Sequence, residues 1–146
     1  MEDITRVVTP DLKRAGDSVL LFVDLGQGQN RLGGSALAQT VKQIGNISPD
    51  MDNPDLVKKA FNVMQECIGK GFILSGHDRS DGGLIATLLE MAFGGNCGLD
   101  IDVRGTGSPI EHLFSEELGL VVECTPEKVQ EVEGLLTERA IPYAVI

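Results

Sequence analysis

Residues 77–83, His-Asp-Arg-Ser-Asp-Gly-Gly, contain the residue types that a magnesium-phosphate site requires. Asp78 and Asp81 carry carboxylates, the oxygen ligands that a hard cation such as Mg²⁺ prefers. Gly82 and Gly83 have no side chain, so a ligand can approach their backbone closely. An apolar run precedes the segment and an amphipathic pattern follows it, which predicts a strand, a tight turn and a helix start. This arrangement directs backbone N–H groups and the positive end of the helix dipole at one point, which favours a phosphate there.

The same segment also fits a purely structural turn. Ser80 or Asp81 could cap the following helix, while His77 and Asp78 satisfy the turn internally. The spacing of the residues does not separate a capped turn from a phosphate site. Both hypotheses therefore stay open at this point.

Charge and composition disfavour several kinds of partner. The 146 residues include 22 acidic and 12 basic side chains, which gives a formal net charge of −10. Nucleic acids and anionic membranes need a basic face, so we expect neither as a partner. No apolar run approaches the roughly 20 residues that span a bilayer.

The three cysteines, Cys67, Cys97 and Cys124, are widely spaced and match neither a metal-ligand pattern nor a disulfide framework. We therefore expect reduced thiols in a cytoplasmic protein. Cys67 lies within the apolar stripe of a predicted helix, so we expect it to be buried as a small hydrophobic residue.

The hydrophobic pattern predicts an α/β fold of the α+β kind, with a layered mixed sheet and flanking helices. Continuous apolar runs and period-two alternation predict strands, whereas apolar residues three and four apart predict helices. The last strand–helix–strand piece resembles half of a ferredoxin-like unit. The predicted strands lie at 18–25, 71–74, 99–103, 119–124 and 142–146, and the predicted helices at 35–44, 56–68, 84–94, 108–114 and 125–136.

The ends of the chain suggest a piece of a larger protein. We expect residues 1–17 to form an extended lead-in and residues 18–146 to form a single globular domain. The chain closes on an apolar strand with no turn signal after it, whereas strands are normally bounded by such signals.

Four segments resemble phosphoribosylformylglycinamidine synthase, a purine-pathway enzyme, in its long single-chain form. They occur in the order of that family and are spread over most of the chain. The resemblance implies a C-terminal subdomain of an aminoimidazole ribonucleotide synthetase-like unit, an α/β layer structure of partly ferredoxin-like character. The four segments are RLGGSALAQ at 31–39, GHDRSDGGL at 76–84, EMAFGGNCG at 90–98 and LFSEELG at 113–119.

That family has two such units, and two departures of this sequence point to the second. The catalytic unit has Asp-x-Gly-Ala-Ala/Gly-Gly at the turn that corresponds to 77–83. It also has an Asn/Ser-Glu-x-Gln pattern where this chain has Ser-Glu-Glu-Leu at 115–118. In the second unit the His-Asp-x-Ser motif belongs to a nucleotide and magnesium site.

The resemblance implies a role for individual residues of this motif. Asp78 matches a Mg²⁺ ligand and Ser80 matches a nucleotide contact, and we assign Gly82 and Gly83 to the same ATP or ADP site. The nucleotide can be held tightly in a structural role. No residue of this chain is assigned to catalysis, and none of its cysteines has the context of a nucleophile elbow.

For the whole enzyme the resemblance implies an ATP-dependent C–N ligase with glutamine as the amide donor. ATP would phosphorylate the amide oxygen of formylglycinamide ribonucleotide, and ammonia would displace the phosphate to give formylglycinamidine ribonucleotide. The partners would be the remaining domains of the same enzyme, the N-terminal synthetase subdomains and the glutaminase domain, so the isolated chain would be inactive.

Two alternatives remain beside this hypothesis. One is a related enzyme of the aminoimidazole ribonucleotide synthetase, selenophosphate synthetase or thiamine-monophosphate kinase type. The other is a structural module that binds no nucleotide. Nucleotide binding by the intact protein separates the structural module from the other two.

Overall fold

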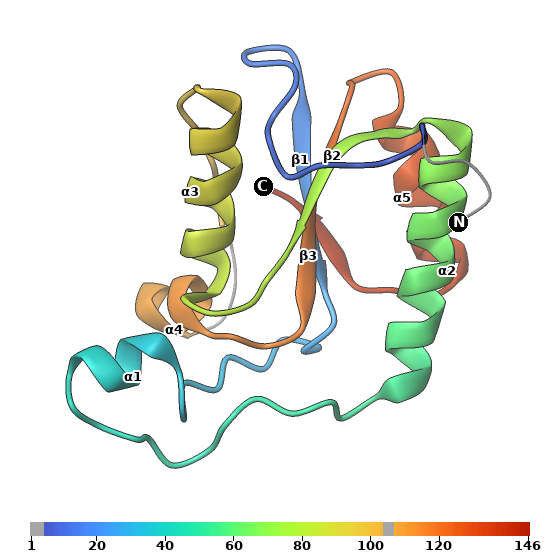
Figure 1. Ribbon diagram of the computed structural model, residues 1–146. Helices are drawn as coiled ribbons and strands as arrows, with labels where there is room; N and C mark the ends of the chain where they lie inside the picture. The colour runs from blue at the N-terminus through green and yellow to red at the C-terminus, as the bar shows by residue number, and fades with distance from the viewer. Residues whose placement is uncertain (1–4, 104–106) are drawn as a thin grey trace.

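The structure, a computed structural model, describes residues 5–103 and 107–146, and this part of the chain contains four strands and five helices. A sheet lies between two helical layers (Figure 1). In chain order the elements are β1 (Val19–Asp24), α1 (Ala36–Thr40), α2 (Pro54–Lys70), β2 (Ile73–Asp78), α3 (Gly83–Gly95), α4 (Pro109–Phe114), β3 (Gly119–Cys124), α5 (Val129–Glu138) and β4 (Tyr143–Val145). Helices α2 and α5 cover one face of the sheet and α3 covers the other.

The strand order is β2-β3-β1-β4, and every neighbouring pair is antiparallel. The predicted fold class is confirmed, with the correction that the sheet is antiparallel rather than mixed. Two strand–helix–strand units, β1–α2–β2 and β3–α5–β4, interleave, so each strand lies beside strands of opposite direction. This is the order of a complete ferredoxin-like sheet, of which the sequence pattern indicated only the second half. Helices α3 and α4 form an insertion between β2 and β3.

Alternate residues of the central strands feed two apolar cores on opposite faces of the sheet. Leu21 and Val23 of β1 belong to the core under α2 and α5, whereas Leu20 belongs to the core under α3. Each fully buried aliphatic side chain contributes about 1.5–3 kcal/mol to stability. The first core contains Leu21, Val23, Leu56, Ala60, Val63, Met64, Cys67, Ile73, Val122, Cys124, Val132, Leu136 and Ile141, and the second contains Leu20, Leu84, Leu88, Met91 and Val121.

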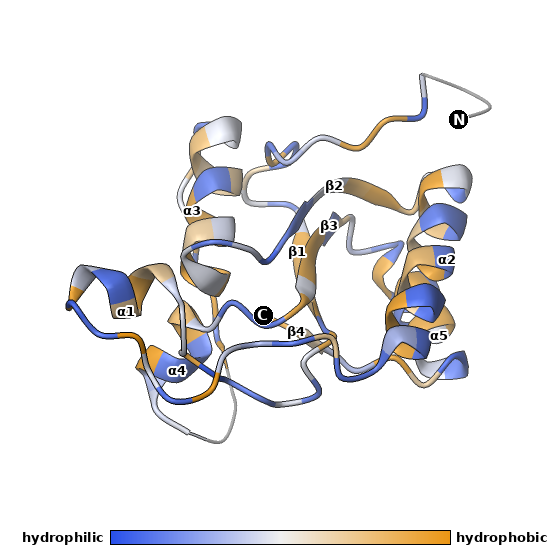
Figure 2. Cartoon of the chain, turned by 60° about the horizontal axis from the view of Figure 1, so that its bottom comes forward, coloured by the Kyte–Doolittle hydropathy of each residue, from blue (hydrophilic) through white to orange (hydrophobic). Residues whose placement is uncertain are grey.

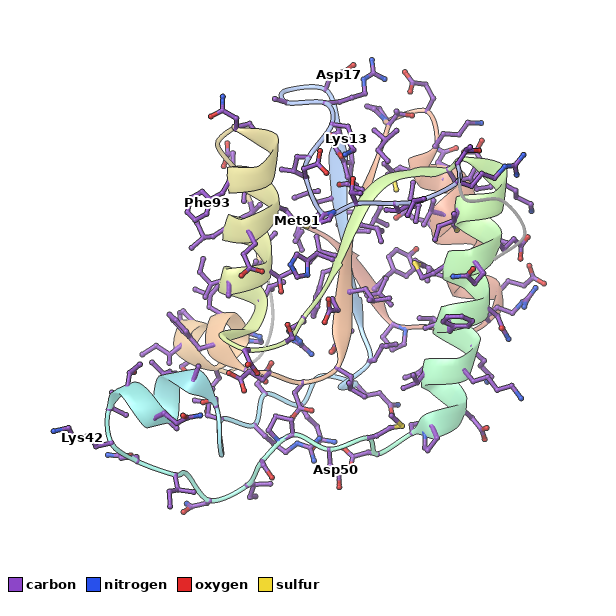
Figure 3. The ribbon with its side chains drawn as sticks, viewed as in Figure 1. Lys13, Asp17, Lys42, Asp50, Met91 and Phe93 are labelled. Carbon is purple, nitrogen blue, oxygen red and sulfur yellow. The ribbon has the colours of Figure 1, made fainter. Side chains whose placement is uncertain are left out.

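Hydropathy follows these layers. The strands are largely apolar, and the polar residues of α2 lie on its outward side (Figure 2). Helix α3 is apolar on most of its circumference, and the sheet covers only part of it. Met91 points to the sheet and is fully buried, whereas Phe93 points away and is 74% exposed (Figure 3). Within the described ranges no helix is long and apolar enough to cross a bilayer.

A buried carboxylate ties the segment before β1 to the sheet. Glu123 of β3 is fully buried and accepts the backbone N–H groups of Lys13 (2.9 Å) and Arg14 (3.0 Å) and the hydroxyl of Ser75 (2.9 Å). Burial alone would raise the pKa of Glu123, but hydrogen bonds outweigh it and hold the pKa below its ordinary value. Residues 5–17 contain no helix or strand. The first four residues of the expected lead-in lie outside the described residues, and the division at residue 17 stays a prediction.

The helix predicted at 35–44 is wrong in its extent. It ends at Thr40, and Val41 and Ile44 are 57% and 83% exposed instead of lining a core. Lys42 adopts a left-handed conformation (φ 57°), which is incompatible with continuing the helix. The apolar spacing was therefore produced by residues that have no common core to face.

The strand predicted at 99–103 is also wrong, because this segment pairs with no strand. Its alternation is nevertheless real, since its three apolar residues pack against the second core while Asp100 and Asp102 are exposed. Period-two alternation reports burial on one side, and a segment that crosses a core shows it without strand pairing. The other differences concern ends: β2 runs on to Asp78, and α5 begins at Val129.

Candidate nucleotide and magnesium site

The turn between β2 and α3 brings the candidate residues together. Strand β2 ends at Asp78, and α3 begins at Gly83. The hydroxyl of Thr87, on the second turn of α3, donates to the carbonyl of Asp78 (3.0 Å) and closes the turn. Ser80 and Asp81, between the two elements, are exposed. The turn therefore presents its polar side chains to the outside of the chain.

The proposed capping of α3 by Ser80 or Asp81 is wrong. The N-cap is Gly82, which has a left-handed conformation (φ 87°) and no side-chain hydrogen bond. Its N–H donates to the carboxylate of Glu116 (2.8 Å), from the segment between α4 and β3. The N–H of Gly83 donates to the carbonyl of Ser80 (2.9 Å). Both glycine N–H groups thus have partners within the chain.

Packing explains why the second of these residues is glycine. Gly83 has φ 76°, and a Cβ atom on it would lie 2.6 Å from the backbone carbonyl carbon of Phe114 at the end of α4. Such a distance is far inside van der Waals contact, so any side chain would push α4 away from α3. The absence of a side chain at Gly83 therefore lets the backbone of α4 approach closely.

Asp78 is accessible to a ligand. Its side chain is 67% exposed, and one carboxylate oxygen lies 3.2 Å from Nδ1 of His77. Nε2 of His77 lies 2.8 Å from a carboxylate oxygen of Glu90 on α3, so the imidazole links the strand to the helix. The described residues contain no group of three or more His, Cys, Asp or Glu that could hold a metal ion.

A magnesium ion nevertheless fits the chemistry of Asp78. Mg²⁺ commonly binds proteins through one or two carboxylates and completes its shell with water and substrate phosphates. A single exposed carboxylate at the start of a turn can supply one such ligand. The described residues thus suit a Mg²⁺ that arrives with a nucleotide rather than one held by this chain alone.

Arg79, inside the same motif, points into the protein. Its side chain is 2% exposed, and its guanidinium donates to the carbonyls of Glu117 and Leu118 and to the carboxylate of Asp24 (3.2 Å). The guanidinium carbon also lies 4.8 Å from the ring centre of Phe22, a cation–π contact. Burial lowers the pKa of Arg79, against the opposing effect of the nearby carboxylates. Arg79 therefore anchors the turn to the end of β1 and to the segment before β3.

A second buried ion pair lies next to this anchor. Glu117 is fully buried, and both of its oxygens accept from the guanidinium of Arg31. The same guanidinium reaches the carboxylate of Asp52 (2.7 Å), before α2. Sequence reasoning missed Arg31, Arg79, Glu116 and Glu117 as structural residues. For the two glutamates the available signal was an acidic pair one residue before the buried strand β3.

Comparison with known proteins gives the family. Residues 14–146 match the family described as AIR synthase related protein, C-terminal domain. The chain belongs to this family. Over 132 residues it is 52% identical to an Arabidopsis thaliana protein named "Probable phosphoribosylformylglycinamidine synthase, chloroplastic/mitochondrial". The matched region covers 89% of this chain and 9% of that protein. The resemblance inferred from the four sequence segments is confirmed.

Solved structures agree on the fold. Thermotoga maritima PurL complexed with FGAR has a TM-score of 0.76 at 19% identity, over 97% of this chain and 25% of PurL. PurL complexed with ATP has a TM-score of 0.67 at 18% identity, over 97% of this chain and 23% of PurL. Thiamine-monophosphate kinase of Stenotrophomonas maltophilia has a TM-score of 0.53 at 14% identity, over 96% and 49% of the two chains. The chain thus corresponds to one part of larger proteins.

Proposed function

We propose that the chain is the C-terminal subdomain of the second synthetase-like unit of a phosphoribosylformylglycinamidine synthase. The 52% identity to the plant relative over 132 residues supports the enzyme, and the two departures from the catalytic unit's pattern, at 77–83 and 115–118, support the second unit. The reaction of the whole protein is the ATP-dependent conversion of formylglycinamide ribonucleotide and glutamine to formylglycinamidine ribonucleotide. The similarity in fold to PurL complexed with FGAR supports the same substrate.

Within that enzyme, the turn from Asp78 to Gly83 contributes a Mg²⁺-nucleotide site. Asp78 supplies a carboxylate to the metal and Ser80 supplies a hydroxyl to the nucleotide, and both side chains are exposed. Gly82 and Gly83 add no side chain at the end of the turn, and their N–H groups donate to Glu116 and Ser80 of the same chain. PurL complexes with ATP, ADP and AMPPCP support a nucleotide. A bound Mg²⁺ would neutralise phosphate charge there.

A purely structural module is the second candidate, and two observations favour it. The first N–H groups at the start of α3 are bonded to Glu116 and Ser80, and the described residues offer no ready cluster of metal ligands. In that case the chain would contribute packing surface to the enzyme and bind no nucleotide.

The partners we propose are the remaining domains of the same enzyme, the N-terminal synthetase subdomains and the glutaminase domain. Large apolar side chains stand exposed on α3 and on the segment between α1 and α2, and such side chains are suited to burial against other domains. They are Leu89 and Phe93 on α3, and Val41, Ile44, Ile47 and Met51 on the connecting segment.

The compartment is a separate question. The sequence predicts the cytoplasm, whereas the name of the plant relative gives chloroplast or mitochondrion. Imaging of the tagged full-length protein in its own cells decides between the two.

The test of the proposed activity compares the intact protein with the isolated chain. The intact protein should form formylglycinamidine ribonucleotide from formylglycinamide ribonucleotide, ATP and glutamine. The isolated chain, supplied with ammonium instead of glutamine, should form none, because it lacks the other synthetase subdomains. An inactive intact protein that instead phosphorylates thiamine monophosphate or selenide would support a related enzyme of the superfamily. Measurable product from the isolated chain would also contradict the proposal.

A further inference from the structure

A carboxylate from outside the helix holds the start of α3. One oxygen of Glu116 accepts the N–H of Gly82 (2.8 Å) and the N–H of Ala36 (2.8 Å). Ala36 is the first residue of α1, so a single oxygen joins the starts of two helices. Both views place α1, α4 and the start of α3 side by side (Figures 1 and 2). Among the described residues Glu116 forms no ion pair, so its charge is stabilised by these N–H groups and the dipole of α3.

The two residues that follow Glu116 reach the same two regions. The carbonyls of Glu117 and Leu118 accept from the guanidinium of Arg79 in the turn. The carbonyl of Leu118 also accepts the N–H of Leu25 (3.0 Å), at the start of the loop that leads to α1. The three-residue segment 116–118 therefore holds both the turn and that loop, with Glu116 at the starts of α1 and α3.

We infer that Glu116 is a positioning residue for the nucleotide turn, an inference that rests on the proposed function. Gly82 has no side chain to restrict its backbone and no side-chain cap, so the hydrogen bond to Glu116 is what fixes it. The orientation of the exposed Asp78 and Ser80 depends on the backbone that Gly82 closes. Glu116 acts through this backbone, because one of its carboxylate oxygens accepts the N–H of Gly82 itself.

The experiment measures the Kd for ADP in Mg²⁺ with the intact protein, after removal of any bound nucleotide and below the Tm of every variant. Glu116→Ala should weaken binding about tenfold, as the loss of an orienting partner behind a metal site does. Glu116→Gln keeps an acceptor oxygen at the same place and should recover most of this loss. If Glu116→Ala does not fold, Glu116→Asp, whose oxygen is one methylene short of both N–H groups, takes its place with the same expectation.

A matched control separates positioning from stability. Glu111 accepts the N–H of Ser108 (2.9 Å) in the capping box of α4, and its side-chain bond among the described residues goes to Ser108 rather than to the turn. Glu111→Ala should lower the Tm and leave the Kd for ADP unchanged.

Three results would overturn the inference. One is an unchanged Kd in Glu116→Ala while Asp78→Asn weakens binding, which leaves the proposed function standing. Another is equal weakening in Glu116→Ala and Glu111→Ala, which indicates a structural role alone. The third is a Glu116→Gln variant as weak as Glu116→Ala. Absence of ADP binding in the unaltered protein contradicts the proposed function itself.

Discussion

Arg31 and Glu117, 86 residues apart in the sequence, form a bidentate ion pair in which the carboxylate is fully buried. Removing Arg31 would leave that carboxylate buried without its partner, which costs more than an exposed pair ever contributes. Arg31→Leu should therefore lower the Tm strongly in thermal unfolding followed by circular dichroism. Asp17→Asn, which breaks the exposed pair of Asp17 with Arg14, should leave the Tm nearly unchanged. Equal shifts in both variants would contradict the structural role of the buried pair.

Two glycines give a matched pair for backbone and packing strain. Gly83 has φ 76°, and a Cβ on it would lie 2.6 Å from the backbone of Phe114. Gly83→Ala should therefore reduce the free energy of unfolding by about 2 kcal/mol or more. A Cβ at Gly134, in α5, meets nothing within 4 Å, so Gly134→Ala should raise it by about 0.5–1 kcal/mol. Urea denaturation measures both values. A neutral or stabilising Gly83→Ala would contradict the close approach of α3 and α4.

Glu123 predicts how stability depends on pH. Hydrogen bonds hold its pKa in the folded protein below the ordinary value despite burial, so its contribution is fully present above the unfolded pKa. That contribution is lost as the pH falls through the folded pKa. Glu123→Gln should lower the Tm at neutral pH and flatten the loss of Tm in acid. Arg14→Ala keeps the backbone N–H that Glu123 accepts, so its acid dependence should match that of the unaltered protein.

The cysteines should differ in reactivity. Cys67 and Cys124 are fully buried, as expected for Cys67, and burial raises their pKa to about 11 and about 12. A buried, protonated thiol is a poor nucleophile, so neither should react with a thiol reagent at pH 8 in the folded protein. Cys97 is partly exposed and should react. Titration with such a reagent, before and after unfolding in urea, checks the difference. Rapid labelling of Cys67 or Cys124 in the native protein would contradict the core assignment.

Local hydrophobic periodicity placed the helices predicted at 56–68 and 108–114 correctly. In the structure Asn53 caps the first, α2, and a capping box of Ser108 and Glu111 starts the second, α4. Such signals work because their partners lie within a few residues. The end of α1 at Thr40 could not be predicted, because whether an apolar side chain faces a core depends on distant segments.

The interior of the candidate site shows the same limit. Asp78 stood out because a carboxylate suits a hard cation, whereas Ser80 was assigned from the resemblance, and both are accessible in the structure. Sequence reasoning assigned no role to Glu116, which bonds to Gly82, 34 residues before it in the chain, and to Ala36, 80 residues before it. Arg79 received no separate role from the sequence, and it is buried within the protein. Contacts of this range are set by the packing of α3 and α4, which composition and periodicity do not encode.

The most direct test of the central claim is the nucleotide content per chain of the intact protein after purification in Mg²⁺. The unaltered protein should retain ATP or ADP, and Asp78→Asn should lose most of it, because the amide lacks the charge that a hard cation prefers. Ser80→Ala should lose less, since one hydroxyl contact contributes about 1 kcal/mol. Asp81→Asn, which alters an exposed carboxylate in the same turn, should retain the nucleotide, and all three variants should keep their Tm once stripped of nucleotide. Nucleotide occupancy in Asp78→Asn equal to that of the unaltered protein would contradict the claim that this turn binds a Mg²⁺-nucleotide.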